Sequence, residues 1–183
     1  MRRLKLQVQA TLDGYMGGAN GEMDWMLPAF TPDLGAHITG IMTGVDTIVL
    51  GRRLAEGFIP HWAARPEHEP DEAIDFMNVS HRVVVSRTLA SSPWDNATIA
   101  PSLDAVATLK DTPGGDLIAY GGATLVAGLI EAGLVDELHL FVHPVSIGAG
   151  LPVFGHGRHD FSVIATTRFD GGILGTTLAP AKP

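Results

Sequence analysis

The sequence predicts an α/β protein with a mostly parallel central sheet and antiparallel strands toward its C-terminal end. Short apolar runs rich in β-branched residues, typical of strands buried on both faces, alternate with helical patterns through the middle of the chain. Near the C-terminus, strand patterns follow one another with no helical pattern between them. Strands joined through a helix pair in parallel, whereas consecutive strands pair antiparallel. The 183 residues, 45% of them hydrophobic, predict one domain spanning residues 1–183.

The first quarter of the chain predicts a strand, a loop, a helix and a second strand. Leu4–Ala10 alternates apolar and polar residues, so one face of this strand is expected to be polar. Thr11–Gly21 holds four glycines, which favours a mobile functional loop over regular structure. Helical spacing after a Thr-Pro-Asp start predicts a helix over Thr31–Thr43. Asp46–Leu50 is an apolar run that predicts a buried strand.

The remaining elements are predicted from helical spacing and from runs or alternation typical of strands. Residues 59–71 are rich in proline, histidine and acidic side chains and are expected to form an exposed connection. The clearest helix begins after Gly122 and carries an apolar stripe, and Gly133 is expected to be its left-handed C-terminal residue. Shorter helices are predicted near Asp71–Asn78 and Ser102–Lys110, and strands over Arg82–Ser86, Asp116–Tyr120, Asp136–His143, Phe161–Arg168 and Ile173–Leu178.

Composition excludes several classes of partner. The net charge is −8 and the basic residues are scattered, so nucleic acid is not an expected partner. There is no cysteine, and only His156-x-x-His159 has metal-ligand spacing, without a third ligand nearby, so no metal is expected. The start of the chain lacks the apolar stretch of a signal peptide, and no run approaches the ~20 apolar residues of a membrane span. We therefore expect a cytoplasmic protein without a membrane partner.

Three predicted strands end in groups suited to bind phosphate. Gly51-Arg52-Arg53 follows the first buried strand, Ser86-Arg87 the second, and Gly121-Gly122-Ala123 the third. Ligands of parallel sheets bind at the carboxyl ends of the strands, and a helix N-terminus attracts anions. Each motif alone has an ordinary structural explanation: a tight turn for the glycines, a solvated surface for the arginines and a cap for the serine. Their coincidence at three strand ends favours a ligand that carries several phosphates.

Missing motifs narrow the class further. No G-x-G-x-x-G follows a strand, and no G-x-x-x-x-G-K-[ST] occurs in the chain, which disfavours a Rossmann dehydrogenase and a P-loop kinase. The G-x-S-x-G elbow of serine hydrolases is missing as well.

Taken together, these motifs resemble the dihydrofolate-reductase-like superfamily, and within it the reductase domain of riboflavin biosynthesis (the C-terminal domain of the bacterial bifunctional deaminase-reductase) and its stand-alone relatives. The resemblance covers nearly the whole chain in the family's order, and its last block is the most specific. The matching segments are Thr11–Met16, Met23–Trp25, Ile48–Arg53, Val84–Arg87, Gly121–Leu125, Gly133–Leu138 and Pro144–Gly150.

This resemblance implies a three-layer α/β/α fold and a reductase that transfers hydride from NADPH. It assigns Ser86 and Arg87 to the 2′-phosphate that distinguishes NADPH from NADH, since a guanidinium holds phosphate bidentately. Ala10 and Gly17 are implied to cover the nicotinamide, and Gly121-Gly122 to be joined by a cis peptide. The cofactor phosphates would be held by Gly51, Arg52, the neighbouring Arg53, Gly121, Gly122, Ala123, Thr124 and Leu125.

The substrate side of the resemblance is less complete. Trp25–Phe30 is similar to the dihydrofolate reductase segment in which an acidic residue grips the pterin, but Phe30 stands at the acidic position and cannot hydrogen-bond a pterin. Asp24 and Asp33 are possible substitutes, although each could instead be a turn or helix-cap residue, which is the favoured explanation for Asp33. Asp13, Asp24 and Trp25 are the candidate catalytic residues.

The expected function is therefore reduction of a small pyrimidine- or pterin-like heterocycle, as in 5-amino-6-(5-phosphoribosylamino)uracil reductase. Two alternatives stay open: dihydrofolate reductase activity, and a non-catalytic nucleotide-binding relative. Relatives of this kind pair as homodimers, and the polar face of Leu4–Ala10 agrees with a homodimer here.

Overall fold

An eight-stranded sheet forms the centre of the protein. The computed structural model describes residues 1–26 and 30–181. The strand order is β5-β4-β3-β6-β1-β7-β10-β9, parallel from β5 to β7 and antiparallel from β7 to β9, and β2 pairs separately with β8. The strands are β1 (Leu4–Thr11), β2 (Tyr15–Gly17), β3 (Val45–Gly51), β4 (His81–Val85), β5 (Ala97–Ala100), β6 (Asp116–Gly121), β7 (Glu137–His143), β8 (Leu151–Pro152), β9 (Phe161–Arg168) and β10 (Leu174–Pro180). The helices are α1 (Pro32–Met42), α2 (Arg52–Ala63), α3 (Asp71–Val79), α4 (Leu103–Lys110) and α5 (Ala123–Glu131).

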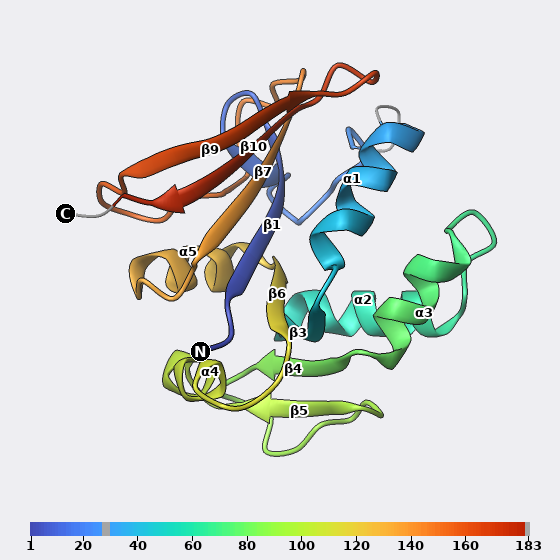
Figure 1. Ribbon diagram of the computed structural model, residues 1–183, viewed down its shortest axis with the longest axis vertical. Helices are drawn as coiled ribbons and strands as arrows, with labels where there is room; N and C mark the ends of the chain where they lie inside the picture. Colours follow the sequence, from blue (N-terminus) through green and yellow to red (C-terminus); the bar gives the residue numbers. More distant parts are fainter. Residues whose placement is uncertain (27–29, 182–183) are drawn as a thin grey trace.

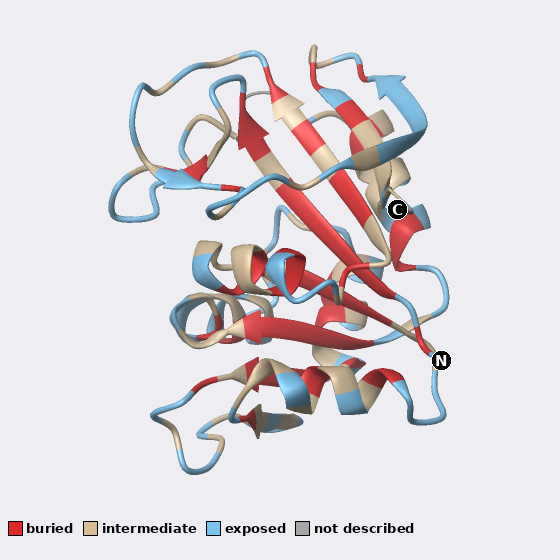
Figure 2. Cartoon of the chain, turned by 90° about the vertical axis from the view of Figure 1, so that its left-hand side faces the viewer, coloured by how far each residue is buried: buried red, intermediate tan, exposed pale blue. Residues whose placement is uncertain are grey.

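Helices cover both faces of this sheet. Figure 1 shows α1, α2 and α3 on one side and α4 and α5 on the other. On the α5 side, Leu4 and Leu6 of β1 share an apolar cluster with Leu129, and on the α1 side Leu34 and Ile48 belong to a second cluster. The central strands are buried, whereas β9 at the edge is exposed along most of its length (Figure 2). The predicted three-layer fold with antiparallel C-terminal strands is confirmed.

The predicted long helices and buried strands are present at the expected positions. Gly133 follows the C-cap residue of α5 and has φ +64°, the left-handed conformation expected of it. Thr31 and Ser102 are the N-cap residues of α1 and α4, but neither side chain makes a capping hydrogen bond. The hydroxyl of Thr31 instead donates to Asp33 Oδ1 over 2.5 Å.

The helix α2 was not expected. Residues 59–71 were predicted to be an exposed connection, but α2 extends through Pro60 to Ala63. Gly57 and Pro60 lower the helix propensity of this segment, and Pro60 offers no N–H for a helical bond. The helix forms because its inner face is buried, with Ile59 only 5% exposed, and burial of one face outweighs local propensity.

Short strands were also missed. The glycine-rich segment Thr11–Gly21 was expected to lack regular structure, yet β2 lies within it and pairs with β8. β5 forms a parallel edge beside β4. These strands were not predicted, because a strand of two to four residues is too short to show an alternating pattern.

The polar face of β1 does not face solvent. Lys5 is 5% exposed and Gln7 is 8% exposed, because α1 covers this face of the sheet. The expectation that this polar face supports a dimer is therefore wrong. Polar side chains on a buried strand face need partners inside the protein.

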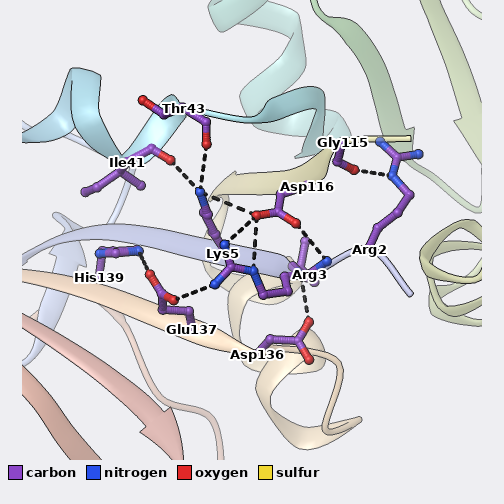
Figure 3. A network of polar contacts seen from close by, with 11 residues as sticks. Arg2, Arg3, Lys5, Ile41, Thr43, Gly115, Asp116, Asp136, Glu137 and His139 are labelled. Carbon is purple, nitrogen blue, oxygen red and sulfur yellow. Dashed lines mark hydrogen bonds and ion pairs between the residues drawn. The ribbon is translucent and has the colours of Figure 1, made fainter. Parts of the chain in front are cut away.

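An ionic network gives Lys5 its partners at the amino-terminal edge of the sheet (Figure 3). The Lys5 ammonium donates to the carbonyls of Ile41, at 2.8 Å, and Thr43, at 3.2 Å, and lies 3.6 Å from Asp116. A cation bonded to the last carbonyls of a helix satisfies groups that have no helical partner. This network holds the end of α1 on the sheet and leaves the opposite, carboxyl-terminal edge for the candidate site.

Candidate cofactor and substrate site

Two helix N-termini meet at the carboxyl ends of neighbouring strands. β3 ends at Gly51, the N-cap of α2, and β6 ends at Gly121, directly before Gly122, the N-cap of α5. A Cβ built on Gly51 would lie 3.2 Å from the backbone nitrogen of Gly122 and 3.5 Å from Leu125 Cβ. The two helix starts are therefore in contact, and a glycine at position 51 lets their backbones approach this closely.

The start of α5 offers free backbone donors. The carbonyl of Gly122 accepts from the N–H groups of Leu125, at 2.9 Å, and Val126, at 3.0 Å. The N–H groups of Ala123 and Thr124 belong to the first turn, where no helical acceptor precedes them. Together with the positive end of the helix dipole, such groups form an anion site. The peptide bond between Gly121 and Gly122 is cis, as the family resemblance implied.

The loop containing β2 closes against this strand end. Gly121 has φ +132°, a conformation that favours glycine, and a Cβ there would lie 3.1 Å from Met16 Cε. Gly17 is buried and pairs with Leu151 of β8. Ala10 is 2% exposed near the end of β1, which is next to β6. The structure thus brings Ala10 and Gly17 to the same edge of the sheet as Gly121.

The predicted basic residues differ in their availability. Arg52 Nη1 lies 2.5 Å from Glu56 Oε1, one turn further along α2, and Arg53 is exposed. Arg87 is exposed and makes no ion pair within residues 1–26 and 30–181. The buried Ser86 hydroxyl accepts from the N–H groups of Thr88, at 3.2 Å, and Leu89, at 3.1 Å, and so shapes the turn that presents Arg87.

Asp13 joins two loops. Its carboxylate accepts from the Ser146 hydroxyl over 2.8 Å and from the Gly148 N–H over 2.7 Å. Hydrogen bonds from Thr11, Gly148 and Ser146 lower the pKa of Asp13 far below its ordinary value. Asp13 thus ties the loop after β1 to the loop after β7, and its oxygens are already hydrogen-bonded.

The remaining acidic candidates differ in their surroundings. Asp24 is exposed in a turn. Asp33 accepts from the Asp170 N–H over 2.9 Å, and the hydrogen bond from the Thr31 hydroxyl lowers its pKa. Phe30 is 46% exposed. The intervening residues Leu27, Pro28 and Ala29 of the pterin-like segment lie outside the described residues.

Trp25 contacts a histidine that the sequence interpretation did not select. Its ring packs edge-on against His143, with centroids 5.0 Å apart and planes at 79°. His143 is the last residue of β7 and is 1% exposed. Its Nε2 lies 2.7 Å from Gln9 Oε1 on β1. His143 could have been selected from the sequence, because it is a polar residue at the end of a predicted strand. The same criterion selected the residues at the ends of the strands near Gly51, Ser86 and Gly121.

Tyr120 is a second residue that was missed. It precedes Gly121 on β6 and stacks on Phe58 of α2, with ring centroids 5.6 Å apart and planes at 26°. Burial raises the pKa of its hydroxyl, which has no hydrogen-bond partner in the part of the chain that the structure describes. An aromatic ring with a buried hydroxyl therefore stands one residue from the candidate phosphate site.

Two cavities lie elsewhere and do not coincide with the candidate site. A cavity of about 440 Å³ is lined by Val45, Asp46, Phe76 and neighbouring residues, at the amino-terminal end of β3. A second, of about 210 Å³, lies beside the end of α5 near His159. Among residues 1–26 and 30–181, no group of three or more histidine or acidic side chains is arranged to hold a metal ion. Within the same residues, no helix combines the length and apolar character needed to cross a membrane.

The strand order and the helices on both faces define a dihydrofolate-reductase-like α/β fold. The structure superposes on a dihydrofolate reductase from Enterococcus faecalis complexed with NADP(H) and RAB-propyl with a TM-score of 0.66 at 16% identity, covering 98% of this chain and 97% of that one. More particularly, the model of the RibD C-terminal domain matches residues 2–173. The chain belongs to the RibD C-terminal domain family.

Individual relatives agree with this family. The chain is 35% identical to the uncharacterized protein YyaP of Bacillus subtilis strain 168, covering 94% of this chain and 92% of that protein. It is 27% identical to the riboflavin biosynthesis protein RibD of Corynebacterium ammoniagenes, covering 82% of this chain and 45% of RibD, so it matches less than half of that protein. A putative riboflavin biosynthesis protein from Shewanella sp. PV-4 has a TM-score of 0.75 at 22% identity, covering 98% of this chain and 99% of that chain.

Proposed function

We propose that this protein is an NADPH-dependent reductase that transfers hydride to a small pyrimidine- or pterin-like heterocycle. The observation that carries the proposal is the contact between the starts of α2 and α5 at Gly51 and Gly122. Two adjacent sets of free N–H groups match the two phosphates of a dinucleotide. Membership of the RibD C-terminal domain family supports a reductase, and the RibD named above is a riboflavin biosynthesis protein.

The residues at this edge fit the cofactor chemically. A Cβ on Gly51 would crowd the backbone nitrogen of Gly122, whereas a Cβ on Gly122 would meet nothing within 4 Å, so a pyrophosphate could approach the backbone at Gly122. Arg52 and Arg53 follow on α2, and Thr124 offers a hydroxyl on the exposed side of α5. In this proposal the phosphates are held by Gly51, Arg52, Arg53, Gly121, Gly122, Ala123, Thr124 and Leu125.

The chain's own contribution to the reaction is binding, orientation and exclusion of water. Ala10 and Gly17 would cover the nicotinamide ring, and Met16, already beside Gly121, would help to exclude solvent. NADPH, when bound, supplies the hydride. Holding the reacting carbon against the cofactor in a dry site lowers the entropic part of the barrier. Water supplies the proton in this proposal, because no side chain among the candidates has to act as a general acid.

Arg87 is proposed to hold the 2′-phosphate of NADPH. It is exposed, and its guanidinium is free of ion pairs with the rest of the described chain. Charge-assisted hydrogen bonds to a phosphate contribute about 1.5–3 kcal/mol, so Arg87→Ala should weaken NADPH binding roughly 10- to 100-fold and leave NADH binding nearly unchanged. Both dissociation constants are measured by titration of the cofactor fluorescence.

Arg168→Ala is the matched control for this experiment. Arg168 is an exposed arginine at the end of β9, at the other edge of the sheet from β4, which precedes Arg87. The Arg168→Ala variant should bind both cofactors as the wild type does. An equal loss of NADPH and NADH affinity in Arg87→Ala would show that Arg87 does not read the 2′-phosphate.

Turnover separates the proposed reductase from its alternatives. NADPH oxidation, followed by absorbance, is measured with a ribosylaminopyrimidine and with dihydrofolate. Oxidation with the pyrimidine supports the proposal, and oxidation with dihydrofolate alone supports a dihydrofolate reductase. Tight NADPH binding without turnover of either substrate supports a non-catalytic nucleotide-binding relative.

We also propose that the chain acts as one domain in the cytoplasm and pairs with a second copy. The exposed edge strand β9 is the proposed contact, since Val163 is 65% exposed and Ile164 is 59% exposed. An edge strand with free backbone groups and exposed apolar residues readily pairs with another strand.

A further inference from the structure

A hydrogen-bonded pair of polar side chains links the neighbouring strands β1 and β7 near their carboxyl-terminal ends. Gln9 Oε1 lies 2.7 Å from His143 Nε2, although the two residues are 134 positions apart in sequence. Gln9 is half-buried and His143 is 1% exposed. Both side chains lie on the face that carries Phe141, which belongs to the apolar cluster of α1. The pair is therefore at the end of the sheet proposed to bind the cofactor, on the α1 side.

The Gln9 oxygen determines which nitrogen of His143 carries the proton. A carboxamide oxygen only accepts hydrogen bonds, so Nε2 is the donor and Nδ1 presents a lone pair. Burial lowers the pKa of His143 to about 4, so the ring is neutral at physiological pH. Nδ1 is buried and has no hydrogen-bond partner among the described residues. Its lone pair thus faces no donor in the described part of the chain.

Trp25 supplies the complementary group beside this acceptor. Its Nε1–H can only donate, is buried, and has no partner among residues 1–26 and 30–181. The two rings are in edge-on contact. An unpaired donor and an unpaired acceptor thus stand in neighbouring rings, and a buried polar group without a partner is costly. A ligand that offers one acceptor next to one donor would satisfy both.

We propose that His143 and Trp25 bind the lactam edge of the substrate heterocycle, with Gln9 as the positioning residue that keeps Nδ1 unprotonated. In a lactam a ring carbonyl stands next to a ring N–H. The carbonyl accepts from Trp25 Nε1–H, and the N–H donates to His143 Nδ1. This inference rests on the proposed reductase function and gives it a substrate contact that needs no carboxylate at Phe30.

The test uses 5,6-diaminouracil as the probe, with 5,6-diamino-1,3-dimethyluracil as its matched partner. The dimethyl compound keeps the carbonyls and loses both ring N–H groups. Binding is measured by calorimetry with the full chain, alone and with NADP⁺. Wild type should bind diaminouracil roughly 10- to 100-fold more tightly than the dimethyl compound, and His143→Leu should lose most of that difference.

Nitrogen NMR gives a readout that does not depend on activity. The His143 ¹⁵N signals, assigned as those missing from His143→Leu, should report a neutral ring with the proton on Nε2. Diaminouracil should shift the Nδ1 signal, and the dimethyl compound should not. Gln9→Leu should redistribute the proton between the two nitrogens and weaken diaminouracil several-fold. His139→Gln, at a buried histidine on the same strand whose Nε2 lies 2.7 Å from Glu137, should bind both compounds as the wild type does.

The outcomes distinguish this inference from the proposed function. If the wild type does not bind NADPH, the reductase proposal is wrong. If NADPH binds but the wild type binds both uracils equally, the lactam assignment alone is wrong, and this comparison needs no variant to fold. Normal diaminouracil binding by His143→Leu overturns the assignment in the same way.

Discussion

His143 is neutral because it is buried, and this couples its titration to folding. Burial lowers its folded pKa to about 4, below the ordinary value of 6.5, and its hydrogen-bond partner Gln9 and ring partner Trp25 are both uncharged. Between these two values the unfolded chain binds the proton and the folded chain does not. The contribution of His143 to the unfolding free energy is therefore fully present above the unfolded pKa and is lost as the pH falls toward the folded pKa.

The first residue-scale prediction follows from this sign. Between pH 7 and pH 4.5 the wild type should lose about 2 kcal/mol of unfolding free energy through His143, and His143→Leu should lose correspondingly less. Urea denaturation at several pH values measures both. His139, whose pKa is also lowered by burial, contributes equally to both proteins and cancels in the difference. Parallel curves for the two proteins would refute the assignment.

The second residue-scale prediction compares two glycines. Gly121 has φ +132°, a conformation that strains any residue with a Cβ, whereas Gly35 lies within α1, where an added Cβ would meet nothing within 4 Å. Gly121→Ala should lower the unfolding free energy by about 1–3 kcal/mol. Gly35→Ala should raise it by about 0.5–1 kcal/mol, because alanine is the better helix former. Chemical denaturation checks both, and a loss in Gly35→Ala would contradict the reasoning.

At the scale of elements, the loop after β1 and the loop after β7 are joined by Asp13. Its bonds to Ser146 and Gly148 hold β2 close to Gly121. Asp13→Ala should therefore raise the hydrogen-exchange rate of the β2 amides several-fold and weaken NADPH binding, because β2 covers the proposed nicotinamide site. Exchange is followed by mass spectrometry.

Asp24→Ala is the control for that experiment, since Asp24 is exposed in the same part of the chain. It should leave β2 exchange unchanged. Equal exchange in all three proteins would mean that the pairing of β2 with β8 holds the loop without Asp13.

At the scale of the whole molecule, the exposed strand β9 bears on assembly. Ile164→Lys places a charge on the proposed contact and should convert a dimer into a monomer in sedimentation velocity runs. Val79→Lys is the control, because Val79 is 79% exposed on α3, far along the chain from β9. A wild type that sediments as a monomer at micromolar concentration would exclude the proposed homodimer.

Local sequence patterns predicted some elements of the fold and missed others. The alternation of β1, the apolar run of β3 and the stripe of α5 predicted these elements, because each pattern extends over several consecutive residues of one element. The end of α2 and the strands β2 and β8 were not predicted, since burial and long-range pairing decided them against weak local signals.

The candidate site divides in the same way. The glycines and arginines after β3, β4 and β6 were predicted because the carboxyl ends of parallel strands meet at one edge. His143, Gln9 and Tyr120 were not, because their role depends on which side chain lies opposite in the register of β1, β6 and β7.

By itself, the sequence determined the α/β class, the places where strands end and the glycine, hydroxyl and guanidinium groups that follow them. Only the tertiary structure decided that the polar face of β1 is buried under α1, that Gln9 meets His143, and that the starts of α2 and α5 touch. The physical reason is that periodicity records the two faces of one element. What covers a face depends on contacts between residues that lie far apart in the sequence.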